Sequence, residues 1–206
     1  LLGCANDVAF VSITLNQAPN AGFNGLITVC DSDDPFQLVN QLNGSPQLNG
    51  TWVNPSSVTH TGIYVPGVNP PGVYTYTVAG VAPCANATAQ VTVIQNAAPD
   101  AGENGVISVC SNNAAFQLFD ELSGTPGPGG NWTGPSGSPV GSTFTPGIST
   151  PGVYEYRIQG VAPCSSDSAT VTVLVNVAPN AGISTVAQIC STSGPVSLIT
   201  LLGGTP

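Results

Sequence analysis

Positive charge is almost absent from this chain of 206 residues. It has no lysine, one arginine and one histidine against ten acidic residues, so the net charge is −9. Nucleic-acid binding depends on neutralising phosphates with Lys and Arg, so the composition excludes nucleic acid as a partner. No apolar run approaches the roughly 18 to 20 residues that cross a bilayer, which argues against direct membrane insertion. Because 41% of the residues are hydrophobic and only 5% are charged, we expect a folded chain whose polar surface is uncharged.

The sequence repeats itself with a period of 80 residues. The period relates Cys4 to Cys84 and Cys164, Cys30 to Cys110 and Cys190, and Trp52 to Trp132, and it also relates Tyr74 and Tyr76 to Tyr154 and Tyr156. A fixed internal period indicates a modular array. Residues that recur in every repeat are most simply explained by the fold.

The period divides the chain into four segments. Residues 17–96 and 97–176 are full repeats, residues 1–16 match the C-terminal strand of a preceding repeat, and residues 177–206 match the N-terminal part of a following one. We therefore expect the chain to be a window from a longer array.

Each repeat shows strand signals and almost no helix signals. Gly and Pro recur every few residues, and Gly72–Val78 alternates in the two-residue period of a half-buried strand. The expected strands of the first repeat are Gly25–Val29, Phe36–Leu42, Thr51–Val53, Gly62–Val65, Gly72–Val78 and Ala89–Ile94. Short strands separated by turns at this spacing predict an all-β chain of tandem immunoglobulin-like β-sandwiches. The Ala-Pro-Asn/Asp-Ala-Gly joints at residues 18, 98 and 178 are short and stiff, which predicts a rod.

The six cysteines are expected to be oxidised, because two per small repeat suit an extracellular disulfide scaffold and no Cys-x-x-Cys occurs. Their connectivity stays open. Bonds within repeats would join Cys30 to Cys84 and Cys110 to Cys164. Bonds across the joints would join Cys30 to Cys164, or alternatively Cys84 to Cys110 together with Cys4 to Cys30 and Cys164 to Cys190.

The motifs together resemble a known family. They are the joint sequence Ala-Pro-Asn-Ala-Gly, Val29-Cys30, Phe36-Gln37-Leu38, Gly50-Thr51-Trp52, Pro71 to Tyr76, Pro83-Cys84 and Val91-Thr92-Val93. This pattern is similar to the immunoglobulin-like and polycystic-kidney-disease-like repeats of giant Bacteroidota surface proteins, among them gliding-motility adhesins secreted by the type IX system. The resemblance implies export, display at the cell surface and a stalk or adhesive role. It also implies that O-glycosylation is available, for which Ser168 in Asp167-Ser168-Ala169 is the candidate.

Few residues point to other chemistry. Asp31, Asp33 and Asp34 are weak candidates for a calcium site, because a solvated turn explains them more simply and the second repeat lacks them. We expect no other metal and no cofactor. The tryptophans and tyrosines are expected in the core, with a sugar-stacking platform as the alternative. His60 is the only histidine and becomes Val140 in the next repeat, so we expect no enzyme and interpret His60 as a surface residue.

The sequence thus predicts a non-catalytic structural segment of a long extracellular, cell-surface adhesin or filament that serves attachment or gliding motility. Its expected partners are neighbouring repeats of the same chain, surface polysaccharide or other copies of itself. Two alternatives stay open, a carbohydrate-binding repeat module and a set of spacer domains in a large secreted enzyme.

Overall fold

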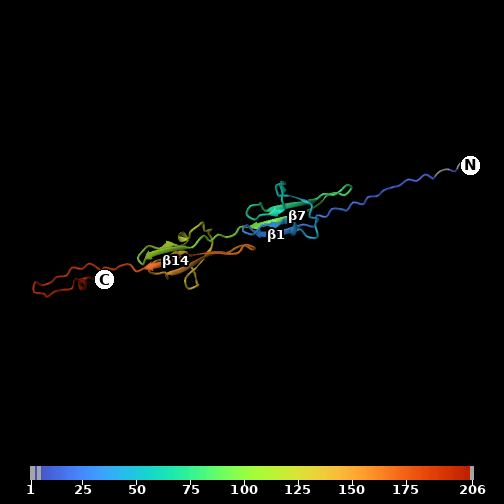
Figure 1. The fold of residues 1–206 in the computed structure, drawn as a ribbon. Helices are drawn as coiled ribbons and strands as arrows, with labels where there is room; N and C mark the ends of the chain where they lie inside the picture. Colours follow the sequence, from blue (N-terminus) through green and yellow to red (C-terminus); the bar gives the residue numbers. More distant parts are fainter. Residues whose placement is uncertain (1–2, 4–5, 205–206) are drawn as a thin grey trace. The chain divides into compact units, whose positions relative to one another are not determined.

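The computed structural model describes residues 3 and 6–204, and they form an all-β protein with two immunoglobulin-like sandwich domains in tandem (Figure 1). Two compact units are formed. The first extends to Pro99 and also includes Gly160–Ser166, and the second consists of Asp100–Gln159 and the chain from Asp167 onward. No helix among the described residues is long and apolar enough to span a bilayer.

The first repeat forms a five-stranded sheet in the order β1-β7-β6-β3-β4 and a separate pair, β2-β5. The elements are β1 (Gly25–Cys30), β2 (Phe36–Gln37), the 3₁₀ helix η1 (Leu38–Gln41), β3 (Thr51–Val53), β4 (Thr59–His60), β5 (Ile63–Tyr64), β6 (Gly72–Val78) and β7 (Ala87–Asn96). β7 lies beside β1 (Figure 1), and this pair is parallel, whereas β6 pairs with β7 and with β3 in antiparallel fashion.

The second repeat has the same topology, with sheet order β11-β10-β13-β14-β8 and the pair β12-β9. Its elements are β8 (Gly105–Cys110), β9 (Phe116–Gln117), η2 (Leu118–Glu121), β10 (Asn131–Thr133), β11 (Pro139–Val140), β12 (Thr143–Phe144), β13 (Gly152–Ile158) and β14 (Asp167–Asn176). The chain after it holds one further 3₁₀ helix, η3 (Leu198–Leu201).

Two expectations about the strands need correction. The segment Phe36–Leu42 is a strand for only two residues and then turns into η1, which places both Leu38 and Leu42 in the core. The strand β4 was not predicted, because its Ser/Thr-rich sequence carries no apolar alternation. The other expected strands are present, and β7 is longer than its apolar run at both ends.

The core of each repeat forms where the large sheet meets the small pair and the 3₁₀ turn. Its aromatic members are Trp52, Tyr64, Tyr74 and Tyr76 in the first repeat and Trp132, Phe144, Tyr154 and Tyr156 in the second. Trp52 packs on Tyr76 with ring centroids 4.8 Å apart, and Trp132 packs on Tyr156 at 5.1 Å. The expectation that these rings are core residues is confirmed, since none is more than 6% exposed.

The tyrosine hydroxyls are satisfied at the edge of the core. Tyr74 donates to the carbonyl of Pro70, 2.8 Å away and four residues upstream, and Tyr154 donates to Thr150 at 2.6 Å. A tyrosine near the start of this strand that bonds back to the preceding backbone is a hallmark of immunoglobulin-like sandwiches. Tyr76 both donates to the carbonyl of Gln47 and accepts from the backbone of Gly50.

The joint motif has a local explanation. The side chain of Asp100 accepts a hydrogen bond from the backbone N–H of Gly102 at 2.8 Å, an Asx turn. Gly102 has φ of +80°, and a Cβ there would lie 2.6 Å from the carbonyl oxygen of Ser123. Asn20 and Gly22 repeat this arrangement in the first repeat. The joint therefore requires Asx and Gly at these positions.

Candidate functional site

A single disulfide is present among the described residues, between Cys30 and Cys164. Cys30 is the last residue of β1, and Cys164 lies in the loop between β13 and β14, within the segment Gly160–Ser166 that belongs to the first compact unit. The α-carbons are 5.0 Å apart, which is within the usual range for disulfides. Both cysteines are buried. The bond links the first sequence repeat covalently to the second.

The register of the first sheet positions the bond. Cys30 pairs with Asn96 at the end of the parallel β1/β7 ladder, so both residues lie at the same end of the sheet. The Asn96 side-chain amide donates to the carbonyl of Ala162 at 2.8 Å, and the Cys164 sulfur lies 3.5 Å from the Asn96 carbonyl oxygen. Asp33 accepts from the backbone N–H of Cys30 at 2.8 Å. Neighbouring polar groups therefore hold both partners in place.

The bonds considered within repeats, Cys30 to Cys84 and Cys110 to Cys164, are not formed. β7 begins shortly after Cys84 and ends opposite Cys30, and its ten residues span roughly 30 Å at about 3.3 Å per residue. The two cysteines of one repeat therefore lie at opposite ends of its sheet, much further apart than a disulfide allows. The pairing of Cys84 with Cys110 is not formed either.

The expectation that all six cysteines are oxidised stays a prediction. Cys84, Cys110 and Cys190 are free thiols, and Cys4 lies outside the described residues. The formed bond has a sequence separation of 134, and a partner that far before Cys84 or after Cys110 would fall outside the 206 residues.

Cys84 nevertheless lies in a loop that makes the same contacts with an upstream asparagine as the loop of Cys164 does. Its thiol donates to the carbonyl of Asn16 at 3.6 Å, and the Asn16 side chain donates to Ala82 at 2.8 Å. These contacts repeat those that Asn96 makes with the bonded loop. The local structure that positions Cys164 therefore forms at Cys84 without a disulfide.

The acidic cluster serves the turn after β1. Asp31 accepts from the backbone N–H of Ala98 at 2.8 Å, and the hydroxyl of Ser111 takes the same role toward Ala178 in the second repeat. Asp34 is exposed. Within residues 3 and 6–204, no group of three or more His, Cys, Asp or Glu side chains could hold a metal ion. Asp31 and Ser111 are thus interchangeable as caps of this turn.

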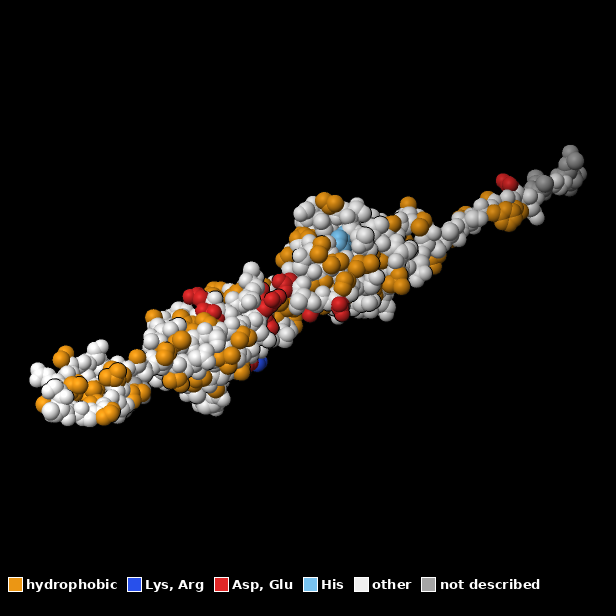
Figure 2. Space-filling model, turned by 60° about the vertical axis from the view of Figure 1, so that its left-hand side comes forward, with side chains coloured by type: hydrophobic (Ala, Val, Ile, Leu, Met, Phe, Trp, Pro, Cys, Tyr) orange, Lys and Arg blue, Asp and Glu red, His pale blue; other side chains and the backbone are white. Residues whose placement is uncertain are grey.

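Ser168 and His60, the predicted glycosylation site and the single histidine, lie on strands β14 and β4. Ser168 is exposed on β14, opposite Arg157, while its neighbour Asp167 accepts from the backbone of Ala101 at 2.7 Å. O-glycosylation of Ser168 stays a prediction. His60 is half-buried at the surface (Figure 2), and its ring packs edge-on against Tyr74 with centroids 5.0 Å apart.

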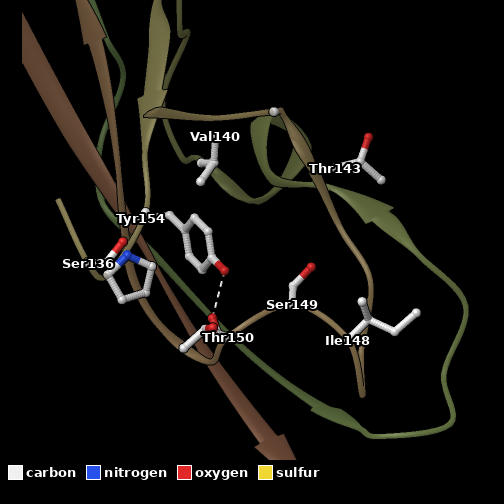
Figure 3. A pocket seen from close by; sticks show the side chains of 10 residues that line it. Ser136, Val140, Thr143, Ile148, Ser149, Thr150 and Tyr154 are labelled. Atoms are coloured by element: carbon white, nitrogen blue, oxygen red, sulfur yellow. Dashed lines mark hydrogen bonds between the residues drawn. The ribbon is translucent and has the colours of Figure 1, made fainter. Parts of the chain in front are cut away.

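The second repeat carries a pocket of about 410 Å³ that the sequence did not reveal (Figure 3). It opens between the β10–β11 turn, the segment from β11 to β12 and the loop before β13. Its lining consists of Gly134, Pro135, Ser136, Val140, Gly141, Thr143, Ile148, Ser149, Thr150 and Tyr154. Figure 3 shows the Tyr154 ring among these side chains, with its hydroxyl bonded to Thr150. No charged residue lines the pocket.

A second hollow of about 370 Å³ lies in the same repeat, lined in part by Trp132, Phe119, Asp120 and Tyr156. Trp132 is only 6% exposed, so its ring is a core element rather than an open stacking platform. Small groups of acidic side chains stand out on a largely uncharged surface (Figure 2).

No protein-family model and no curated protein matches the chain. Solved structures that resemble it are the titin I-band fragment I67–I69 (12% identity, TM-score 0.48), the insect immune protein hemolin (15%, 0.46) and four N-terminal immunoglobulin domains of Dscam1 (13%, 0.45). They match 79%, 80% and 81% of this chain. The chain spans 65% of the titin fragment and 48% of each of the other two. The strand order and register described above carry the assignment of the fold.

Proposed function

We propose that this chain is a tension-bearing, non-catalytic segment of a long extracellular adhesin or filament, in which disulfides link successive repeats. The observation that carries the proposal is the Cys30–Cys164 bond, which joins one repeat to the next instead of closing a single repeat. A bond within a repeat would stabilise a small core, whereas a bond between repeats also resists their separation under load.

The path of force through the chain supports this role. Tension applied at the two ends would pass along the chain to Cys30, through the disulfide to Cys164, and onward. The residues between the two cysteines, which include β2 to β7 and β8 to β13, lie outside that path. Most strands would therefore stay folded while the chain carries load.

Composition and fold suit an exposed fibre. Tandem immunoglobulin-like domains are typically non-catalytic, and disulfide-bonded domains of this kind resemble extracellular proteins. Arg157 is the only residue that trypsin-like proteases recognise. Together with the resemblance of its motifs to Bacteroidota gliding-motility adhesins, these features favour display at the cell surface for attachment or gliding. The proposed partners are neighbouring repeats, surface polysaccharide and other copies of the chain.

Cells that display the full-length protein provide a test under shear flow. The double variant C30S/C164S is expected to detach at lower shear than the unaltered protein, while attachment without flow stays the same. The matched control is S165A, which changes an exposed residue beside Cys164 and leaves every cysteine in place. Equal detachment of C30S/C164S and the unaltered protein would refute the proposal.

The pocket of the second repeat favours a second function, the carbohydrate-binding module. Its size lies within the ~300–1,000 Å³ range of small-molecule sites.

A further inference from the structure

We propose that the pocket around Tyr154 is a binding site for one neutral sugar unit of a polysaccharide, and that the first repeat is closed to the same ligand by its own side chains. This inference rests on the carbohydrate-binding function proposed above and is independent of the role proposed for the disulfide.

Three substitutions between the repeats explain the pocket. Asn54, His60 and Thr61 of the first repeat become Gly134, Val140 and Gly141, so each position loses bulk. Gly141 borders open space, since a Cβ there would meet no atom within 4 Å. Four further lining positions differ as well, since Thr143, Ile148, Ser149 and Thr150 replace Ile63, Val68, Asn69 and Pro70. Pro135, Ser136 and Tyr154 are shared, and so is the tyrosine hydroxyl that bonds back to the loop.

In the first repeat the corresponding space is occupied. The His60 ring covers Tyr74 and is fixed by a hydrogen bond that its Nδ1 accepts from the backbone N–H of Gly62 at 3.1 Å. The Asn54 side chain accepts from the backbone of Ser56 at 3.0 Å and of Val58 at 2.9 Å. Tyr74 is fully buried, whereas 5% of Tyr154 is exposed.

The lining selects for a neutral, polar ligand. Burying a charge without a partner is costly, and no charged side chain lines the pocket. An apolar ligand would leave hydroxyls without partners. The Ser149 oxygen accepts from the backbone N–H of Thr145 at 3.0 Å, so its own hydrogen is free to donate to a ligand.

A sugar ring satisfies both sides of this lining. Its hydroxyls match those of Ser136, Ser149 and Thr150, and its C–H face matches the apolar surface of Val140 and Ile148 (Figure 3). Glu155 is the nearest acid in sequence to Tyr154, but alternation along β13 directs it to the other face of the sheet. A single sugar unit is thus the ligand class that leaves the fewest groups unpaired.

The test is titration of the complete, oxidised chain with neutral oligosaccharides from dextran, galactan and mannan, followed by calorimetry. At least one is expected to bind saturably with one site per chain. The variant V140H/G141T, which restores two residues of the first repeat, is expected to weaken binding at least ~10-fold. The reciprocal variant N54G/H60V/T61G/N69S/P70T opens the space and also supplies the two loop hydroxyls, and it is expected to raise the number of sites from one to two.

The control D120N alters the neighbouring hollow and is expected to bind normally. NMR shift mapping on the unaltered protein checks the location without any variant, and the shifts are expected within residues 134–154. The proposal is overturned if no member of the panel binds, if V140H/G141T binds normally, if D120N abolishes binding, or if the shifts lie elsewhere.

Discussion

Asn96 and Asn16 occupy equivalent positions one repeat apart, and each donates its side-chain amide to a loop carbonyl at 2.8 Å, Ala162 in one case and Ala82 in the other. Beside the first loop Cys164 is bonded to Cys30, and beside the second Cys84 is free. The loop geometry therefore does not depend on the disulfide.

Peptide mapping without reduction checks the connectivity. Cleavage on the amino side of each aspartate puts every cysteine on its own peptide, because Asp residues lie between all six. We expect peptide 7–30 to be linked to peptide 120–166. A link from peptide 7–30 to peptide 34–99, which holds Cys84, would contradict the structure.

Removal of the bond should lower stability. C30S is expected to reduce the free energy of unfolding by about 2–5 kcal/mol, because the bond closes a long loop in the unfolded chain. Urea unfolding followed by circular dichroism measures the loss. C84S is the matched control in the equivalent loop and should change stability by less than about 0.5 kcal/mol. Similar losses for both variants would show that the bond itself adds nothing.

Glycine is required at the second joint. G102A is expected to destabilise by about 1–3 kcal/mol, because the added Cβ forces strain at positive φ and meets the Ser123 carbonyl. Urea unfolding of G102A beside G141A tests this, since Gly141 has open space and no positive φ. We expect G102A to lose more free energy of unfolding than G141A, and equal losses would contradict the prediction.

Alkaline pH should unfold the first repeat through Tyr74. Burial, with a smaller contribution from Tyr64, raises the pKa of Tyr74 to about 12 from its ordinary value of 10.0. The phenol therefore holds its proton more tightly when folded, so its contribution to stability is complete below pH 10 and is lost as pH rises toward 12. The free energy of unfolding, measured in urea from pH 9 to 12, should decline more steeply with pH for the unaltered protein than for Y74F. Parallel declines would contradict this assignment.

The repeat period and the alternation of apolar residues were enough to predict the sandwich and the buried Trp52 and Tyr74. The 3₁₀ turn at Leu38 was missed because two leucines four residues apart fit a strand or a tight turn equally well in one sequence. The disulfide partner of Cys30 could not be identified from the sequence, because it depends on which loop lies next to the end of β1 in the folded chain. The residues that recur in both repeats could not predict the pocket, because it opens where the repeats differ, at Gly134, Val140 and Gly141 among others.

Extension of single molecules tests the central claim, that the Cys30–Cys164 bond carries load between repeats. Pulled by its two ends under oxidising conditions, the chain should extend only outside the 134-residue separation. Addition of a reductant should then release roughly 440–480 Å of further contour length, at about 3.3–3.6 Å per residue. An equal contour length before and after reduction would contradict the account.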